Sequence, residues 1–211
     1  MKIKICGLRS HRNVEAISEL KPDYMGFIFH KNSPRYVDKM SIYTTGMIPA
    51  EIKKVGVFVN EQKERIEEYI MTYNLDVIQL HGNESPEFCN YFHKQGLEVI
   101  KAFGITIADD FLQCSAFHET CTLFLFDTKT KNHGGSGRKF NWQILDEYQG
   151  ATAFMLSGGI NKDAEEEIKH INHPQFIGVD INSRFESEPG RKDVEKVKEF
   201  ISQLRNNKNK I

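Results

Sequence analysis

The stretch Leu123-Phe124-Leu125-Phe126-Asp127 is a continuous apolar run that ends in a carboxylate. A strand of a parallel sheet is buried on both faces, so it carries apolar residues at consecutive positions rather than at alternate ones. About half a chain earlier, the stretch Lys2-Ile3-Lys4-Ile5-Cys6-Gly7 ends in a thiol. In parallel α/β folds, ligands bind and chemistry takes place at the carboxyl ends of the strands. The two stretches therefore predict strands of one sheet, with Cys6 and Asp127 as a proton-transfer pair at its functional edge. Taken singly, Cys6 fits a small buried hydrophobe and Asp127 a helix cap.

Apolar runs of the same kind recur along the whole chain. They lie at 3–6, 24–29, 55–59, 76–80, 99–103, 122–127, 153–156 and 176–180. Helical patterns separate them, the clearest at 61–73 and near the end of the chain, where Val194, Val197, Ile201 and Leu204 repeat at helical spacing. Ser85 followed by Pro86 predicts a capped helix start, and we expect Asn60 and Asn161 to be helix caps as well.

Eight strands that alternate with helices through right-handed crossovers close naturally into a (β/α)₈ TIM barrel of the α/β class. A doubly wound open sheet is the alternative, but it usually carries a glycine-rich fingerprint after the first strand, and Cys6-Gly7-Leu8-Arg9 is not one. No linker or shift in composition divides the chain. We therefore expect a single barrel domain over residues 1–205 and a frayed polar tail over 206–211.

The composition fits a soluble globular protein and argues against a general binder of nucleic acid or membrane surfaces. Among the 211 residues, 39% are hydrophobic and 27% charged, and the formal net charge is −1, whereas binding to nucleic acid or a membrane surface favours a strong basic excess. No segment approaches the roughly 20 apolar residues of a membrane span. The four cysteines show no metal-ligand spacing, which predicts reduced thiols in the cytoplasm and no metal site.

The residues that follow the other strands supply binding groups for the same edge. Arg35 lies in a proline-stiffened loop after the second run and suits a planar carboxylate, although a solvated arginine on a turn is the alternative. His81 follows the fourth run as either a ligand contact or a loop histidine. A glycine-rich segment at 134–137 could close over a substrate, but any sharp turn uses glycine.

The loops after the seventh and eighth strands commonly hold a phosphate in barrels. Here these loops contain Gly158 and Gly159, whose backbone N–H groups can approach a phosphate closely, and Asn182 and Ser183. The edge of the sheet would thus offer a phosphate site, a carboxylate clamp and two titratable groups.

Several short motifs, in the same order along the chain, resemble those of one known family. They are Lys4-Ile5-Cys6-Gly7-Leu8, Gly26-Phe27-Ile28-Phe29, Ser33-Pro34-Arg35, Val55-Gly56-Val57-Phe58-Val59-Asn60, Gln79-Leu80-His81-Gly82, Phe126-Asp127, Gly134-Gly135-Ser136-Gly137 with Phe140 and Trp142, Leu156-Ser157-Gly158-Gly159-Ile160 and Pro189-Gly190-Arg191-Lys192-Asp193. The family is phosphoribosylanthranilate isomerase, of tryptophan biosynthesis, and the resemblance runs from the first strand to the last helix.

The resemblance implies a (β/α)₈ barrel that needs neither metal nor organic cofactor. It implies an Amadori rearrangement of N-(5-phosphoribosyl)anthranilate, a phosphosugar, to the corresponding carboxyphenylamino-deoxyribulose phosphate, with Asp127 as general acid and Cys6 as general base. Arg35 would grip the carboxylate of the substrate, and the protein would be a monomer or a homodimer. Arg184 stands where the family typically has a small residue, so it either crowds the phosphate loop or adds a contact to it.

The proposed base raises a question of ionisation. A free thiol titrates near ~8.5, so we expect a lowered pKa for Cys6 or an adjustment on substrate binding. Lys4, on the same face of the strand, is the candidate for a compensating positive charge.

Two other functions use the same fold. A ribulose-phosphate epimerase would use paired carboxylates and commonly a metal, with no need for Arg35. A catalytically silent phosphate-binding barrel would keep Gly158 and Gly159 but lack a working acid/base pair.

Overall fold

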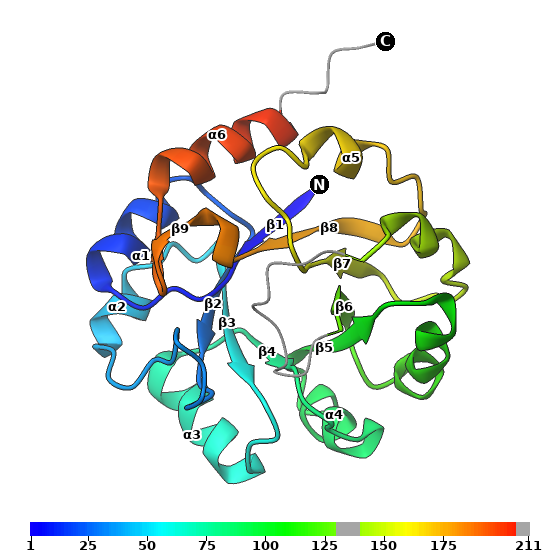
Figure 1. Cartoon of the computed structure of the whole chain (residues 1–211). Helices are drawn as coiled ribbons and strands as arrows, with labels where there is room; N and C mark the ends of the chain where they lie inside the picture. Colours follow the sequence, from blue (N-terminus) through cyan, green and yellow to red (C-terminus); the bar gives the residue numbers. More distant parts are fainter. Residues whose placement is uncertain (130–139, 206–211) are drawn as a thin grey trace.

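Eight parallel strands close into a barrel, and helices cover its outside, in the computed structural model, which describes residues 1–129 and 140–205 (Figure 1). The strands are β1 (Lys2–Ile5), β2 (Tyr24–Ile28), β3 (Lys53–Phe58), β4 (Val77–Leu80), β5 (Glu98–Ile105), β6 (Leu123–Thr128), β7 (Phe154–Leu156) and β8 (Phe176–Ile181). Each strand pairs with the next, and β1 also pairs with β8, which closes the barrel. The predicted (β/α)₈ barrel and its eight apolar runs are confirmed.

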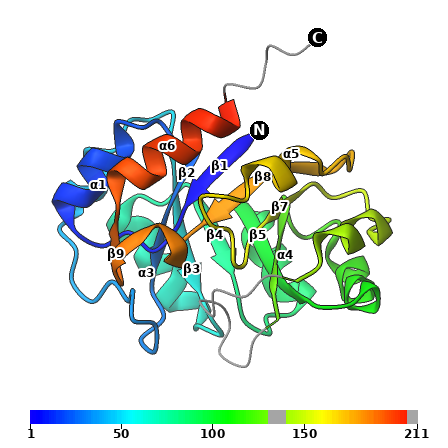
Figure 2. The same ribbon diagram turned by 45° about the horizontal axis from the view of Figure 1, so that its top comes forward.

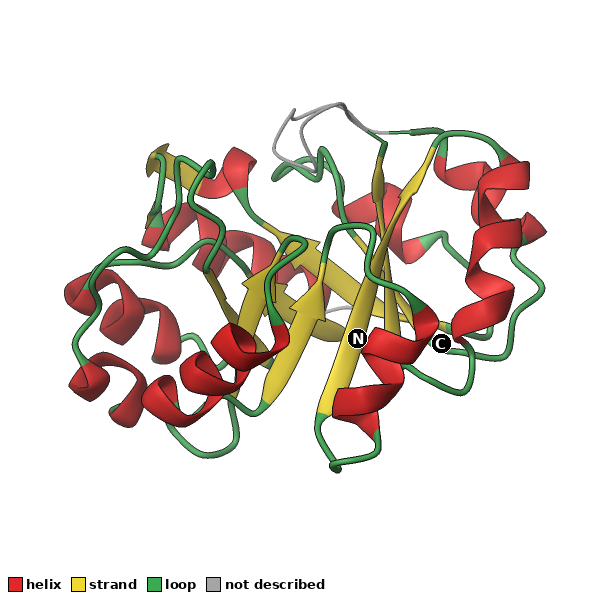
Figure 3. Cartoon of the chain, turned by 90° about the horizontal axis from the view of Figure 1, so that it is seen from below, coloured by secondary structure: helices red, strands yellow, loops and turns green. Residues whose placement is uncertain are grey.

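The connections between the strands are mostly short helices. The α-helices are α1 (His11–Ser18), α2 (Ile42–Gly46), α3 (Lys63–Tyr73), α4 (Pro86–His93), α5 (Glu165–Lys169) and α6 (Val194–Arg205). The 3₁₀ helices are η1 (Ala108–Phe117), η2 (Trp142–Glu147) and η3 (Ser183–Phe185), and β9 (Glu186–Glu188) and β10 (Arg191–Lys192) form a small antiparallel hairpin before α6. Figures 2 and 3 show the helices arranged around the strands from two further directions. In Figure 2, α1 lies beside α6.

The predicted helix starts are right in one case and wrong in two. Ser85 caps α4, where its hydroxyl accepts a hydrogen bond from the Phe88 N–H and Pro86 is the first helical residue. Asn60 is not a cap, because α3 begins later, after Gln62; Asn60 lies at φ +51° and its side chain accepts from the Asn83 N–H of the next loop. Asn161 caps only the turn that precedes α5, through the Asp163 N–H.

The alternation of side chains along each strand divides the core into two layers. On β6, Leu123 and Leu125 point into the barrel, where they pack with Val55, Val77, Ile100 and Met155. Phe124 and Phe126, between them in sequence, point outward and pack against the surrounding helices. Since successive residues of a strand face opposite sides, Asp127 shares the inner face of Leu123 and Leu125. The apolar run that predicts the strand thus also places the carboxylate that ends it inside the barrel.

The predicted tail at 206–211 and the glycine-rich segment at 134–137 lie outside the described residues. The boundary of the barrel domain at residue 205 therefore stays a prediction. Within the described ranges, none of the helices has the length and apolar character that crossing a lipid bilayer requires.

The outer aromatic layer gives the first testable prediction. Phe126 is fully buried, with ring centroids of Phe111, Tyr148 and Phe154 at 5.0, 5.0 and 4.7 Å. Phe126→Ala should lower the free energy of unfolding by about 3–5 kcal/mol, because it removes a large buried side chain and leaves a cavity. Urea unfolding measures the change. The control is Leu112→Ala in η1, where the side chain is 74% exposed and the expected change is within about 0.5 kcal/mol. Equal losses in the two variants would contradict the assignment of Phe126 to the core.

Candidate active site

Four ionisable side chains meet inside the barrel, at the carboxyl ends of its strands. Cys6 follows β1, His81 follows β4, Asp127 lies in β6 and Asp180 lies in β8. Cys6, Asp127 and Asp180 are all buried. Asp180 interacts electrostatically with Cys6 on one side and with Asp127 and His81 on the other. The predicted pair, Cys6 and Asp127, therefore belongs to one connected group that crosses the mouth of the barrel.

A buried ion pair lies beneath the thiol. Lys4 and Asp180 are register partners on neighbouring strands, and the Lys4 ammonium donates to Asp180 Oδ2 at 2.9 Å. The Lys4 side chain is 0% exposed. Burial alone would lower the pKa of Lys4, but the negative charge of Asp180 outweighs this effect, with a further contribution from the Cys6 side chain, so the pKa of Lys4 is raised. Lys4 is therefore held as a cation next to Cys6, the place that the sequence analysis gave it. Asp180 was not among the predicted site residues, although its place at the end of the eighth run was the available signal.

Burial controls the ionisation of Cys6. It raises the pKa of the thiol, and the charge of Asp180 raises it further, while the ammonium groups of Lys4 and Lys192 only partly offset them. The expected lowering of the pKa of Cys6 is therefore wrong for the protein alone, because desolvation outweighs the nearby cations. The alternative expectation, an adjustment on substrate binding, stays open.

The carboxylate of Asp127 contacts the backbone N–H of the next residue and the ring of a histidine. Its Oδ1 accepts from the Thr128 N–H at 2.7 Å, and its Oδ2 lies 3.4 Å from His81 Nε2. The other ring nitrogen, Nδ1, lies 2.8 Å from the amide nitrogen of Gln79. With the amide donating, the neutral ring carries its proton on Nε2, which faces Asp127. His81 thus lines the site and contacts the acid candidate, and Gln79 is a partner that the sequence analysis missed.

Gly158 packs directly against this carboxylate. It lies at φ +83°, and a Cβ there would be 2.5 Å from both Asp127 Oδ1 and the Thr128 hydroxyl. Any other residue would push against Asp127, so the glycine is needed for the acid as well as for the predicted approach of a phosphate. Gly159, also at positive φ, continues the same loop, beside the loop that follows β8.

The guanidinium of Arg35 is buried at the mouth and pairs with a carboxylate of the protein. Arg35 Nε lies 2.9 and 3.1 Å from the two oxygens of Glu186, and Nη2 lies 2.7 Å from Oε2. The alternative of a solvated arginine on a turn therefore does not hold. Glu186 was not among the predicted site residues, because its pairing with a residue 151 positions away leaves no signal in the sequence.

The loop after β8 is organised by a second buried lysine. Lys192 donates to the carbonyl oxygen and to the side-chain Oδ1 of Asn182, at 3.3 and 2.7 Å, and to Glu186 Oε1 at 2.7 Å. Asn182 and Ser183, the predicted phosphate residues, stand at the start of η3. Gly7 passes close by, since a Cβ on it would be 2.6 Å from Asn182 Oδ1 and 2.7 Å from Arg35 Cδ.

The unusual Arg184 does not crowd the interior of this loop. Arg184 is exposed, whereas its neighbour Phe185 is fully buried and packs against Phe200 of α6, with ring centroids 4.8 Å apart. The phenylalanine fills the space below the loop, so the arginine lies on the outer surface.

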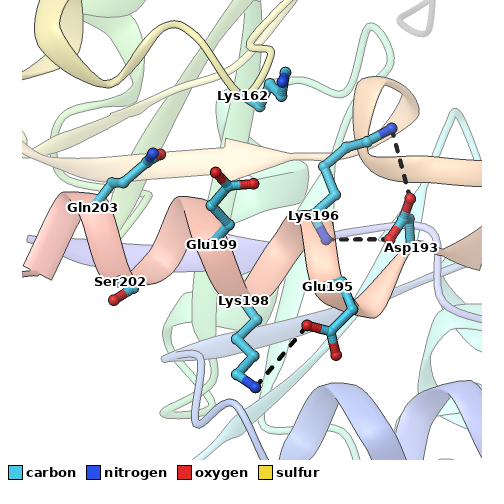
Figure 4. Close-up of a pocket in the computed structure, with 8 residues that line it drawn as sticks. All are labelled: Lys162, Asp193, Glu195, Lys196, Lys198, Glu199, Ser202 and Gln203. Carbon is cyan, nitrogen blue, oxygen red and sulfur yellow. Dashed lines mark hydrogen bonds and ion pairs between the residues drawn. The ribbon is translucent and has the colours of Figure 1, made fainter.

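A groove on the outer surface of α6 is a second candidate site, and its side chains offer less chemistry (Figure 4). It is lined by Lys162, Asp193, Glu195, Lys196, Lys198, Glu199, Ser202 and Gln203. Two of its lysines pair with nearby carboxylates: Lys196 lies 3.8 Å from Asp193, the residue before α6, and Lys198 lies 4.0 Å from Glu195 in the helix. Exposed pairs of this kind contribute little and present no buried or activated group. In the part of the chain that the structure describes, His, Cys, Asp and Glu side chains form no group suited to hold a metal ion.

Comparison with known proteins agrees with this geometry. The family model of N-(5'phosphoribosyl)anthranilate (PRA) isomerase matches residues 3–203. An N-(5'-phosphoribosyl)anthranilate isomerase of Parabacteroides distasonis is 44% identical over 206 residues, covering 97% of this chain and 93% of that relative.

Two solved structures share the whole fold. Phosphoribosyl anthranilate isomerase from Thermotoga maritima has a TM-score of 0.85 at 31% identity, over 97% of this chain and 98% of that one. A phosphoribosyl anthranilate isomerase in complex with reduced 1-(o-carboxyphenylamino)-1-deoxyribulose 5-phosphate has a TM-score of 0.82 at 30% identity, with the same coverage.

The raised pKa of Cys6 gives a prediction for its reactivity with iodoacetamide. Only the thiolate reacts, so alkylation of Cys6 should still accelerate above pH 9 rather than level off near the ordinary thiol pKa of ~8.5. Lys4→Met removes a charge that lowers this pKa, so the thiolate fraction at a given pH below the pKa falls and the reaction should be slower there than in the unmodified protein. Peptide mass spectrometry of Cys6 measures the rate.

Lys2→Met is the matched control, because the Lys2 side chain is 53% exposed at the other end of the same strand. Its profile should equal that of the unmodified sequence. A plateau below pH 8, or the same profile in both lysine variants, would contradict the electrostatic account of Cys6.

Proposed function

The chain belongs to the N-(5'-phosphoribosyl)anthranilate isomerase family and catalyses the Amadori rearrangement of that family, and we propose that Cys6 and Asp127 transfer the protons. The reaction opens the aminofuranose ring of N-(5'-phosphoribosyl)anthranilate and moves the carbonyl from C1 to C2. It is a step of tryptophan biosynthesis. The epimerase and the silent phosphate-binding barrel are thereby set aside.

The chemistry needs one acid and one base. A proton is added to the ring oxygen, the bond between that oxygen and C1 breaks, and the nitrogen lone pair forms a C1=N double bond. A base then removes the proton from C2, and the resulting enolamine tautomerises to the amino-ketose. Each proton transfer by a positioned side chain contributes roughly 10²–10⁴-fold to the rate.

The observation that carries the assignment is the position of two titratable groups at one end of the barrel, on β1 and β6. Asp127 would protonate the ring oxygen, with His81 Nε2 3.4 Å from its Oδ2 to orient it. Cys6 would take the C2 proton. The protonated imine that ring opening creates carries a positive charge close to C2, which favours the thiolate of Cys6 and offsets the cost of its burial.

The two anionic ends of the substrate fit the two positive regions of the mouth. The Arg35 guanidinium suits the carboxylate of the anthranilate ring, because both groups are planar and can form parallel hydrogen bonds. The phosphate would be bound by the backbone of Gly158 and Gly159 and by Asn182 and Ser183, in the adjacent loops after β7 and β8. A structural relative in complex with a reduced aminodeoxyribulose phosphate supports this class of ligand.

We also propose an oligomeric state, a partner class and a location in the cell. We expect a monomer or a homodimer, no nucleic-acid partner, and activity in the cytoplasm. The four free cysteine thiols support the last of these, because a reducing compartment preserves them.

The acid and base assignments are tested by two conservative variants. Cys6→Ser replaces the thiol with a far weaker base, and Asp127→Asn keeps the shape but abolishes the transferable proton. Each should lower kcat by at least about 10²-fold and leave KM little changed, since the loss falls on the transition state. Steady-state kinetics with a freshly prepared substrate measures both values. Near-normal kcat in the serine variant would remove Cys6 from the mechanism, and a main effect on KM would make Asp127 a binding residue.

The carboxylate clamp gives a separate prediction. Arg35→Met should lower kcat/KM by roughly 10- to 150-fold, because it removes a charge-assisted pair worth about 1.5–3 kcal/mol. Arg35→Lys should recover only part of this, since an ammonium lacks the planar fork. Kinetics with an analogue that lacks the ring carboxylate provide the control. If Arg35→Met still strongly prefers the carboxylated ring, the carboxylate clamp lies at another residue.

A further inference from the structure

Glu186 is enclosed by hydrogen-bond donors. Its carboxylate accepts from Arg35 Nε and Nη2, from the Lys192 ammonium at 2.7 Å and from the Gly190 N–H at 3.1 Å. The side chain is 4% exposed. Burial alone would raise the pKa of Glu186, but hydrogen bonding to Arg35 and the charge of Lys192 outweigh it and lower this pKa. These donors therefore favour the ionised carboxylate of Glu186.

The ion pair with Glu186 uses only one of the two hydrogen-bonding edges of the Arg35 guanidinium. A guanidinium can bind one carboxylate along the edge formed by Nε and Nη2 and another end-on, through Nη1 and the second hydrogen of Nη2. Glu186 occupies the first edge with three contacts between 2.7 and 3.1 Å. The end-on edge is the one that an external carboxylate can use.

Glu186 also connects Arg35 to the loop that follows β8. Lys192, which shares Glu186 with Arg35, holds both the carbonyl and the side-chain oxygen of Asn182 after β8. The backbone of Lys192 is in turn anchored to the Asn13 side chain of α1 by bonds of 2.9 and 2.7 Å. The position of the guanidinium is thus set by a rigid buried network rather than by its own flexible side chain.

We propose that Glu186 is a positioning residue that fixes Arg35 with its end-on edge toward the substrate and thereby sets the selectivity of the enzyme for a carboxylated aromatic ring. The proposal rests on the proposed role of Arg35. Glu186 itself acts through Arg35 and transfers no proton.

Loss of the negative charge should release the arginine. In Glu186→Gln the amide keeps one acceptor oxygen, but its NH₂ group faces the N–H donors of Arg35, Lys192 or Gly190, and the two cations are left without a shared anion. Arg35 then turns away from its position, although the acid and the base are untouched. The expected result is a higher KM with kcat nearly unchanged.

The experiment compares kcat/KM for the natural substrate and for N-(5'-phosphoribosyl)aniline, which lacks the ring carboxylate. Glu186→Gln should lower the ratio of the two values by about tenfold or more, the effect of one hydrogen bond to a charged group. The matched control is Glu188→Gln, on the same hairpin, where the side chain is 65% exposed and pairs with Arg191 at 3.6 Å. It should keep the original ratio. In an Arg35→Met background, Glu186→Gln should change the ratio no further.

An unchanged ratio in folded Glu186→Gln, or an equal additional loss in the Arg35→Met background, would overturn the proposal. If Glu186→Gln does not fold by circular dichroism, Glu186→Asp serves instead. It keeps the charge but is one methylene too short to reach Arg35 and Lys192 together, so the ratio should fall partway, and an unchanged ratio would overturn the proposal. A ratio that also stays unchanged in Arg35→Met would mean that the proposed carboxylate clamp fails, whereas a loss in Arg35→Met alone would mean that only the role of Glu186 fails.

Discussion

The closed ring of parallel strands constrains every other feature of this protein. Side chains alternate between the inside of the barrel and its outer surface, and most of the inside is filled by residues such as Leu123, Leu125 and Ile100. Polar side chains that point into the barrel can then reach a ligand only near the carboxyl end of each strand. Cys6, Asp127 and Asp180 occupy such positions, so the chemistry gathers at one end of the barrel because the remainder of its interior is needed for packing.

The polar end of the barrel tolerates burial because each charge has an opposite partner. Lys4 pairs with Asp180, and Glu186 pairs with both Arg35 and Lys192. Taking a charge out of water costs several kcal/mol, and a close, hydrogen-bonded partner is needed to offset it. Although Asp180 pairs with Lys4 through Oδ2, its Oδ1 is buried and accepts no hydrogen bond from the described residues, and the same holds for the side-chain oxygen of Gln79. A buried acceptor left in this state is unfavourable for folding and is typical of a functional position.

The sequence reveals what depends on strand periodicity and hides what depends on contacts between distant loops. The eight apolar runs predict the barrel, and the residue that ends each run marks the mouth, which is how Cys6 and Asp127 were found. Glu186, Lys192 and Gln79 were not predicted as site residues, because their contacts form only in the folded chain and no sequence spacing indicates them. The pKa of Cys6 was expected to move the wrong way, since the degree of desolvation of a thiol follows from packing in three dimensions. Asn60 and Asn161 were mistaken for helix caps because asparagine serves turns and helix starts equally well.

The network around Arg35 also bears on how such an enzyme can change over time. Two cations share one anion there, so replacing Arg35 leaves Glu186 neutralised by Lys192 alone and removes the excess positive charge of this cluster. Replacing Glu186 first leaves two buried cations without their shared anion. The order of changes therefore matters: a change that begins at Arg35 keeps a balanced pair, whereas a change that begins at Glu186 passes through a state with unpaired buried charge.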